Sequence, residues 1–500
     1  MKNLSNNQVV VEIQNLGMNG EGVARFNGKV LFIPFALKGE IVLAEIVKNK
    51  SNFAIGKIIE ILKSSQYRIK PQCPYFMECG GCSLQHLKYN QQLDFKTNLV
   101  CETIQKICKI SVNVCSCVPS LLDFNYRNKI TLYFGLLNNK VILGYYHEKT
   151  KNLISIEECY LAPSWFKIVI KTIIDFVNSN NIRIYNYLNK TGYLKGVSVK
   201  IVGTSILITF ISFSKINLKV NLLVDELINK LKLYKINNVS IFLNVNSKED
   251  TNFLTTENYV IYGNNFVDYN QFGLTNKIGN LSFCQVNNDI KDKLYHSVLE
   301  QINNDDFVID AFSGTGQLSA LLATKAKKVI GVEIVKQAWE SAEILKKENG
   351  LFNLENINGD CEIVLPQLLQ NLNLLHRNNY GDAGSRNNQC NNVRDGFFNN
   401  YFEVKNDKSV NKNTGNIVLV LDPPRVGVLD NVLKAINKCS QKNNNSLVKI
   451  NKIIYISCNP VSLAKNLNSL LENFKIEKIV PFDMFPQTSK VETLVILKSR

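Results

Sequence analysis

From about residue 285 to the C-terminus, segments typical of β-strands alternate with segments typical of α-helices. This alternation constrains the fold more than any other feature, because neighbouring parallel strands need a crossover connection that a helix usually supplies. We therefore expect a parallel α/β sheet, which binds its ligands at the carboxyl ends of the strands.

Residues 307–319, FVIDAFSGTGQLS, predict a cofactor site at such an end. A strand runs to Asp310, and a glycine-containing turn then opens a helix. The next strand ends at Glu333, about 20 residues on, where a carboxylate can accept both ribose hydroxyls of an adenosine cofactor. Asp360 follows a third strand-like piece and is placed to meet the adenine. NAD and S-adenosylmethionine (SAM) both fit, but Ser319 breaks the G-x-G-x-x-G pattern, which favours SAM.

Two further motifs follow buried strands. In the first, LDPPRVG, two prolines after Asp422 fix an extended segment. Arg425 stands where amino-group methyltransferases carry an aromatic ring, which argues against methylation of an adenine or cytosine amino group. In the second, ISCNP, Cys458 ends a strand and Asn459-Pro460 opens a helix, whose dipole favours the thiolate. No histidine lies near Cys458 in the sequence, so a Cys–His hydrolase is not indicated.

Glu492 lies in a strand that follows the Pro-containing loop FDMFPQTSK. A thiolate and a carboxylate beside SAM suggest one reaction. Thiolate addition to carbon 6 of uracil makes carbon 5 nucleophilic, carbon 5 takes the methyl group, and a base removes the carbon-5 proton so that the thiol is eliminated. Cys458 fits the nucleophile and Glu492 fits the base.

The charge and the cysteines indicate where such a protein works. The 500 residues include 58 Lys and Arg against 42 Asp and Glu, a formal net charge of +16, which favours a polyanion such as a nucleic acid. The first residues lack the apolar core of a signal peptide, and the most apolar later run is too short to span a membrane. Thirteen cysteines, an odd number, fit a reducing cytoplasm better than a disulfide scaffold.

Short glycine-punctuated strands fill the first 60 or so residues and predict a small barrel of OB type. The predicted strands cover Val9–Ile13, Val30–Ile33, Ile41–Val47 and Ala54–Ile61. A helix is expected over about 91–110, and mixed strands and helices over about 118–285, including a strand over 197–213 and a helix over 164–178. An Asn-rich stretch at about 367–416 predicts a disordered insertion, and 440–445 a shorter loop.

Cys73, Cys79 and Cys82 have the spacing C-x5-C-x2-C, with two glycines that let the backbone wrap around a ligand. A tetrahedral zinc or a cubane cluster needs a fourth cysteine from a distance, for which Cys159 is a candidate. On sequence grounds Cys159 competes with four others, namely Cys101, Cys108, Cys115 and Cys117. Spacing alone does not separate zinc from iron–sulfur.

With these motifs, over nearly its whole length, the chain resembles the RNA uracil-5-methyltransferase family, in its TRAM-containing iron–sulfur branch. The resemblance implies a TRAM-like RNA-binding barrel over 1–63 and a mixed α+β iron–sulfur domain over 64–284, with part of 85–118 packed on the catalytic domain. It also implies a Rossmann-like class I SAM-dependent methyltransferase domain over 285–500. The implied ligands of a 4Fe–4S cluster are Cys73, Cys79, Cys82 and Cys159. The implied SAM pocket consists of Gln285, Phe312, Gln317, Glu333, Asp360 and Asp422.

The resemblance also implies Cys458 as nucleophile, Glu492 as base, and RNA as the partner, with no membrane and no obligate protein partner. The chain departs from the family pattern at Lys490, where a His is usual, and at Ser313 and Gln317, where Cys and Asn are common. The simpler transfer-RNA enzymes typically lack the barrel and the cluster, which favours 23S rRNA over tRNA. A cytosine-5 RNA methyltransferase would need a second cysteine where Arg425 stands, and a decayed, merely RNA-binding protein would not keep these motifs intact.

Overall fold

The computed structural model describes residues 7–147, 150, 152–248, 253–380, 416–440 and 449–500. The chain divides into two compact units. The first unit comprises residues 1–102, 114–294 and 480–492, and the second comprises 103–113, 295–479 and 493–500. No described helix is long and apolar enough to cross a membrane.

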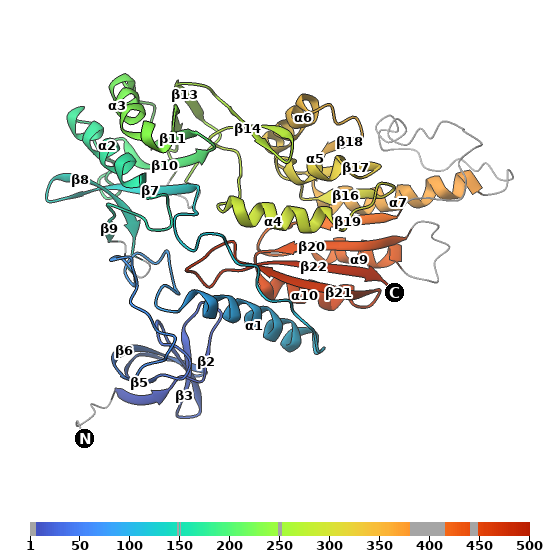
Figure 1. Ribbon diagram of the computed structural model, residues 1–500, viewed down its shortest axis with the longest axis horizontal. Helices are drawn as coiled ribbons and strands as arrows, with labels where there is room; N and C mark the ends of the chain where they lie inside the picture. The colour runs from blue at the N-terminus through green and yellow to red at the C-terminus, as the bar shows by residue number, and fades with distance from the viewer. Residues whose placement is uncertain (1–6, 148–149, 151, 249–252, 381–415, 441–448) are drawn as a thin grey trace. The chain divides into compact units, whose positions relative to one another are not determined.

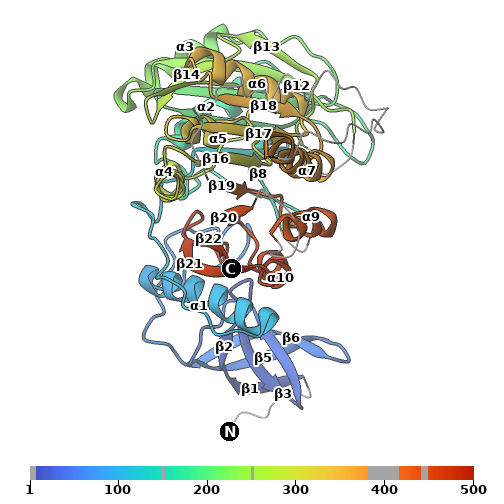
Figure 2. The ribbon, with the colours of Figure 1, turned by 90° about the vertical axis from the view of Figure 1, so that its right-hand side faces the viewer.

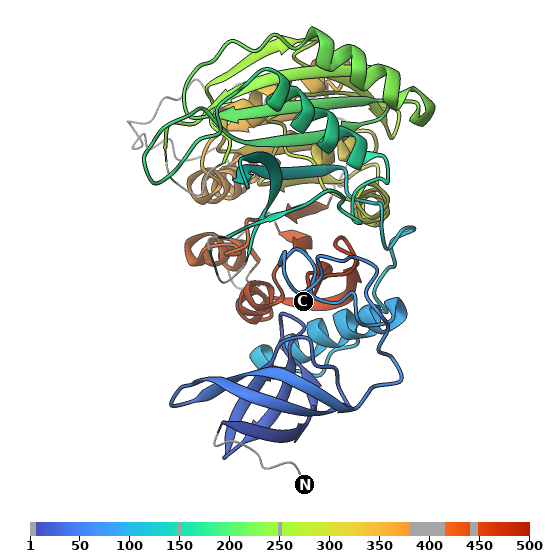
Figure 3. The ribbon, with the colours of Figure 1, turned by 90° about the vertical axis from the view of Figure 1, so that its left-hand side faces the viewer.

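The first unit begins with a six-stranded sheet in the order β1-β5-β6-β4-β3-β2. Its strands are β1 (Gln8–Glu12), β2 (Asn15–Leu16), β3 (Gly22–Phe26), β4 (Lys29–Ile33), β5 (Ile41–Asn49) and β6 (Phe53–Lys63). Register shifts between β5 and β6 bend the long strands. The Gln14 N–H donates to the Val23 carbonyl (2.8 Å), so the sheet curls on itself around a small apolar core (Figure 3). The four predicted strands are confirmed, and β2 and β3 add to them.

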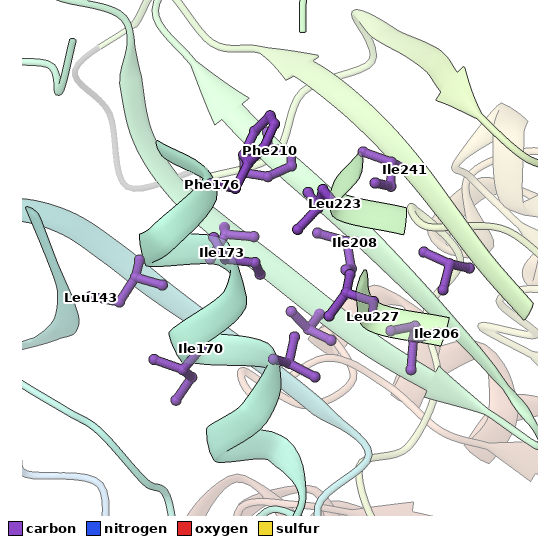
Figure 4. Packing of buried hydrophobic residues seen from close by; sticks show 14 of the residues in the cluster. Leu143, Ile170, Ile173, Phe176, Ile206, Ile208, Phe210, Leu223, Leu227 and Ile241 are labelled. Atoms are coloured by element: carbon purple, nitrogen blue, oxygen red, sulfur yellow. The ribbon is translucent and has the colours of Figure 1, made fainter. Parts of the chain in front are cut away.

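A seven-stranded sheet forms the larger part of the first unit, in the order β13-β12-β11-β10-β7-β8-β9. Its strands are β7 (Lys129–Leu137), β8 (Lys140–Tyr146), β9 (Leu153–Ser155), β10 (Leu194–Val202), β11 (Ser205–Ser212), β12 (Asn238–Val245) and β13 (Asn258–Tyr262). Helices α2 (Phe166–Ser179) and α3 (Asn221–Leu231), the latter followed by η1 (Lys232–Tyr234), pack apolar stripes onto it. Figure 4 shows Ile170, Ile173 and Phe176 of α2 facing the strands. Helix α1 (Tyr89–Cys108) and the hairpin β14 (Val267–Gln271)–β15 (Leu274–Ile278) stand outside this sheet.

The third large sheet has the order β18-β17-β16-β19-β20-β22-β21 (Figure 1). Its strands are β16 (Phe307–Ala311), β17 (Lys328–Glu333), β18 (Leu354–Asn358), β19 (Ile417–Leu421), β20 (Ile450–Ser457), β21 (Phe474–Phe482) and β22 (Glu492–Ser499). The helices that accompany it are α4 (Asn288–Leu299), α5 (Gln317–Ala323), α6 (Lys336–Glu348), α7 (Cys361–Tyr380), α9 (Asp430–Ser440) and α10 (Pro460–Leu470).

Strands β16 to β20 are parallel, and β22 is antiparallel to β20. Helices α7, α9 and α10 lie along one face (Figure 2). The chain builds outward from β16 to β18 and then returns to β19 on the other side of β16. The predicted α/β fold is confirmed, and its strand order reverses between β16 and β19, where such sheets bind ligands.

Two sequence predictions need correction. Residues 367–380 belong to helix α7, so the predicted insertion begins too early: buried Leu365, Leu368 and Leu369, at helical spacing, extend the helix into it. The remainder, 381–415, lies outside the described residues, as do 441–445 of the second predicted loop, whose first residue, Ser440, ends α9. The strand expected over 197–213 is two strands, β10 and β11, which turn at Gly203, whose φ is 57°. Both strands are so apolar that the turn between them is hard to see in the sequence.

Candidate active site and cysteine site

The turn after β16 is built from backbone conformations that few side chains adopt. Gly314 and Gly316 have φ of 57° and 77°, and Phe312, which is not a glycine, has φ of 66°. A Cβ on Gly316 would lie 2.6 Å from the Cβ of Ala342 in α6, so glycine lets α5 begin close to α6. Gln317 is the first residue of α5. Strain of this kind is typical of a functional turn.

Glu333 ends β17 beside this turn. Its carboxylate accepts hydrogen bonds from the Gly314 N–H (2.8 Å) and the Val335 N–H (2.7 Å), which hold it at the edge of the sheet. Asp360 follows β18, and its Oδ1 accepts from the Glu362 N–H (2.9 Å) at the start of α7. A helix cap alone explains an aspartate at this place, so a contact with a cofactor stays a prediction for Asp360.

Two more carboxylates lie at the reversal of strand order. Burial raises the pKa of Asp310 to about 7; the charges of Asp422 and Glu333 also raise it, and a hydrogen bond from the Ser319 hydroxyl lowers it. Burial likewise raises the pKa of Asp422, directly after β19, to about 7. Carboxylates from β16, β17 and β19 therefore gather within electrostatic range of one another. Such an edge suits a ligand that carries hydroxyl groups and a positive charge.

The DPPR segment after β19 is fixed by two asparagines of the cysteine motif and its helix. Gly427 has φ of 87°, and a Cβ there would lie 2.5 Å from the Asn466 Oδ1. The same oxygen accepts from the Tyr455 hydroxyl (2.7 Å) of β20. Asn459 Nδ2 donates to the Arg425 carbonyl (3.0 Å). The Val428 N–H donates to the same Asn466 oxygen (2.8 Å), so an exposed and a buried hydrogen bond hold together the two segments that carry the predicted chemistry of this sheet.

Cys458 directly follows β20, is partly exposed, and precedes helix α10. Asn459 caps this helix by accepting from the Val461 N–H (3.1 Å), and Pro460 is its first residue. Asn before Pro is a recognisable helix start, and the helix predicted to open at Asn459-Pro460 is confirmed. The cap fixes the backbone beside the thiol.

Glu492 is the first residue of β22 and is 3% exposed. In the antiparallel pairing of β20 with β22, Ser457 lies opposite Thr493. Cys458 directly follows one member of this pair and Glu492 directly precedes the other. The register therefore brings the predicted nucleophile and the predicted base to the same end of the pairing, although 34 positions separate them in the sequence.

Gln285 lies in the first unit, ahead of α4, where its carbonyl accepts from the Asn128 side chain (2.9 Å). Phe312, Gln317, Glu333, Asp360, Asp422 and Cys458 lie in the second unit. Asp310 and its hydrogen-bond partner Ser319 also belong to this edge of the sheet, although neither was predicted as a site residue. The sequence did contain a signal for this pair. Ser319 occupies the position at which the turn departs from the G-x-G-x-x-G pattern, and Asp310 ends the strand just before that turn.

The four cysteines assigned as ligands lie within electrostatic range of one another in the first unit. Burial raises the pKa of Cys82 to about 12, and the charges of Cys159, Cys79 and Cys73 raise it further. Burial also raises the pKa values of Cys73 and Cys79, and Cys159 contributes to both shifts. None of the rival cysteines contributes to these shifts.

The backbone around the thiols is shaped for a ligand. The Gly81 N–H points at the Cys79 Sγ (3.4 Å), a Cβ on Gly81 would lie 3.3 Å from the same sulfur, and Gly80 has φ of 68°. Hydrogen bonds from the buried Gln85 side chain lower the pKa values of Cys73 and Cys82. Across the described residues, however, no three His, Cys, Asp or Glu side chains are arranged to hold a metal ion. Four thiols with hydrogen bonds to their sulfurs are chemically suited to bind a metal or iron–sulfur group as thiolates. In this structure the thiols are close enough to shift one another's pKa values but are not arranged as a set of ligands.

The sequence matches the tRNA (Uracil-5-)-methyltransferase family over residues 88–367 and 399–500, and the TRAM domain over 6–59. An uncharacterized RNA methyltransferase of Clostridium tetani is 32% identical over 97% of this chain and 95% of its own. Another, from Caldanaerobacter subterraneus subsp. tengcongensis, is 31% identical over 98% and 97%. The crystal structure of Pyrococcus abyssi tRNA (uracil-54, C5)-methyltransferase with S-adenosyl-L-homocysteine superimposes with a TM-score of 0.69, at 22% identity, over 99% of this chain and all of that one.

Proposed function

Because the chain belongs to the tRNA (uracil-5-)-methyltransferase family and is an RNA methyltransferase with a TRAM domain, we propose that it methylates carbon 5 of a specific uridine, with SAM as methyl donor. Cys458 adds to carbon 6 of the uracil, and Glu492 removes the carbon-5 proton after methyl transfer. The observation that carries this assignment is the β20–β22 register, which brings a cysteine and a buried carboxylate to one end of a strand pair.

The carboxylates at the switch point support SAM as the donor. Glu333, held by two backbone N–H groups, presents an acceptor for ribose hydroxyls beside the glycine turn. Burial raises the pKa values of Asp422 and Asp310 to about 7, and a bound sulfonium would favour their ionised forms, so the carboxylates and the positive charge would stabilise each other. Phe312 and Gln317 flank the turn, and Asp360 follows the next strand but one. Gln285, in the first unit, is proposed as a cofactor residue from the family resemblance alone. When bound, SAM supplies the electrophilic methyl group.

For the cysteine site we propose a 4Fe–4S cluster held by Cys73, Cys79, Cys82 and Cys159. Support comes from the mutual influence of the four thiols and from the N–H and amide groups aimed at their sulfurs, which are the usual hydrogen bonds to cluster ligands. Methyl transfer to uracil needs no redox step, so the proposed role of the cluster is structural.

The proposed RNA is 23S rRNA, and tRNA is the second candidate. The N-terminal barrel and the cysteine site favour rRNA, because the simpler tRNA enzymes typically lack both. The fold that a Pyrococcus abyssi tRNA (uracil-54, C5)-methyltransferase shares over 99% of this chain favours tRNA. In either RNA the backbone would be bound by the basic surface, and the target base would be flipped out of its stack.

The deciding experiment is tritium release from RNA labelled at carbon 5 of uracil, in the presence of SAM. Wild-type enzyme should release tritium, and Cys458→Ala should reduce release to background while retaining RNA binding. Cys439→Ala is a matched control, because Cys439 lies in α9 and has no part in the proposed chemistry. Substantial release by Cys458→Ala would refute the mechanism. Offering 23S rRNA and tRNA separately, and mapping the product, identifies the substrate.

A further inference from the structure

Helix α1 carries a stripe of polar side chains on a buried face. Tyr89, Gln92 and Lys96 stand at i, i+3 and i+7, so they share one side of the helix. Gln92 and Lys96 are both fully buried. Buried polar groups need partners, and all three side chains find one in the loop 483–491 between β21 and β22. Gln92 Nε2 also donates to the Leu84 and Leu87 carbonyls (3.1 and 2.9 Å). This loop leads directly into Glu492, and α1 up to residue 102 shares the first unit with it.

The ion pair at the start of the loop sets one anchor. Lys96 Nζ pairs with Asp483 Oδ1, and both side chains are fully buried. The Tyr89 hydroxyl donates to Asp483 Oδ2 (2.8 Å), and Lys96 Nζ also donates to the Phe485 carbonyl (3.0 Å). Two residues of the helix stripe thus fix the first three residues of the loop.

A pair of glutamines sets the second anchor. Gln92 Nε2 donates to Gln487 Oε1 (2.9 Å), and the Gln487 N–H donates to Gln92 Oε1 (3.0 Å). Gln487 has φ of 68°, a conformation that residues other than glycine rarely adopt, and it is 2% exposed. A strained conformation persists only where its surroundings enforce it, and the reciprocal pair does so here.

The third anchor comes from the cysteine segment. The N–H groups of Ser83 and Leu84 donate to the Gln487 carbonyl (3.1 and 3.0 Å), and the Ser489 N–H donates to Ser83 Oγ (3.0 Å). Ser83 directly follows Cys82. Every polar group of the Gln487 backbone is therefore used, half by α1 and half by the segment that carries a proposed cluster ligand.

We propose that Gln92 and Gln487 are positioning residues for the base of the methyl transfer reaction, and that the segment after Cys82 transmits the state of the cysteine site to the same loop. The inference rests on the proposed role of Glu492. It assigns the cysteine site a definite task, which is to hold the loop that delivers the base.

The test compares Gln92→Leu with Gln91→Leu in the full-length protein. The two substitutions are identical and adjacent, but the Gln91 side chain donates to Asp94 (2.8 Å) in an exposed hydrogen bond within the same helix. In Gln92→Leu, hydrogen–deuterium exchange of peptides covering 83–84 and 483–491 should accelerate by about tenfold or more, while strands β16 to β20 stay protected. Gln91→Leu should leave both regions unchanged. Unchanged exchange of 483–491 in Gln92→Leu would overturn the proposal.

The reaction itself provides a second readout. RNA containing 5-fluorouracil traps the methylated covalent adduct without using the base, so Gln92→Leu should form this adduct at a rate close to that of wild type. On ordinary RNA the same variant should turn over about tenfold more slowly and accumulate the covalent complex. Equal losses in both assays would show that Gln92 supports the fold rather than the base, which would refute the proposal. If Glu492→Gln accumulates no adduct, the assignment of the base is wrong, and the exchange experiment still judges the anchoring of the loop.

Two further variants keep the proposal testable if Gln92→Leu does not fold. Ser83→Ala removes only the acceptor of the Ser489 N–H, and it should accelerate exchange at the 487–491 end of the loop. Cys159→Ser removes a thiol that is remote in sequence from Ser83. After anaerobic preparation it should accelerate exchange over 83–84 and 487–489 as well as around the cysteines. If neither substitution changes the hydrogen–deuterium exchange of the loop, the link to the cysteine site is refuted.

Discussion

Asp310 lies beneath the glycine turn and is 1% exposed, so replacing it with asparagine tests the electrostatics of the site. Its pKa is raised from the ordinary 3.8 to about 7, with burial as the largest cause. The folded protein therefore holds a proton on Asp310 between about pH 4 and pH 7 that the unfolded chain has released. The free energy of unfolding consequently falls as the pH rises through this window.

The size of the effect follows from the shift. A difference of about 3 pKa units, at 1.36 kcal/mol each, corresponds to about 4 kcal/mol of stability lost between pH 4 and pH 8. Asp310→Asn removes this loss, because an amide has a similar shape, accepts from the Ser319 hydroxyl through its oxygen, and does not ionise. The free energy of unfolding of the variant, relative to that of wild type, should therefore be about 4 kcal/mol higher at pH 8 than at pH 4.

The assay is urea or thermal unfolding of both proteins in the absence of SAM at pH 4.5, 6 and 8. At about 2–4 °C per kcal/mol, the thermal midpoint of Asp310→Asn minus that of wild type should rise by about 10 °C from pH 4.5 to pH 8. Ser319→Ala is the opposing variant: it removes the hydrogen bond that lowers the pKa of Asp310, so it should extend the fall of stability to higher pH. A difference between Asp310→Asn and wild type that is the same at every pH would refute the reasoning.

Three other outcomes are expected. Glu492→Gln should accumulate a covalent, methylated RNA–enzyme complex on ordinary RNA, seen as a band stable in denaturing gels; loss of activity without that band would contradict its role as base. Anaerobically purified protein should contain about four irons, and Cys159→Ser should lose them as fully as Cys79→Ser while Cys101→Ser keeps them; stoichiometric zinc in place of iron would refute the cluster. Gly316→Val should weaken SAM binding in calorimetry by at least about tenfold, because its side chain would collide with α6; unchanged affinity would place the cofactor elsewhere.

The strands of the catalytic sheet could be predicted because each is a short apolar run that ends at a chemically distinctive residue. Asp422 and Cys458 were readable in this way, and so was the helix start at Asn459-Pro460. The β10–β11 turn was not, because two almost fully buried strands joined by Gly203 and Thr204 read as one apolar run. Periodicity cannot separate strands that are buried on both faces.

The anchoring of the loop before Glu492 could not be predicted either. Gln92 and Gln487 look like ordinary surface glutamines in the sequence, and their partnership spans 395 positions. Pairs of this kind depend on which helix face the fold buries, and that choice is made by tertiary packing. Likewise, Lys96 reads as a solvent-exposed charge until its partner Asp483 is known.

The buried Lys96–Asp483 pair has a consequence for how the protein is made. Its two members are 387 residues apart in the chain. At about 5–20 residues per second, the ribosome completes Asp483 about 20–80 s after Lys96. During that interval the N-terminal part of the chain has an ammonium group whose burial nothing yet compensates, so helix α1 cannot settle into its final place. We therefore expect the newly made barrel and central sheet to remain incompletely packed, and accessible to chaperones, until the last strands leave the ribosome.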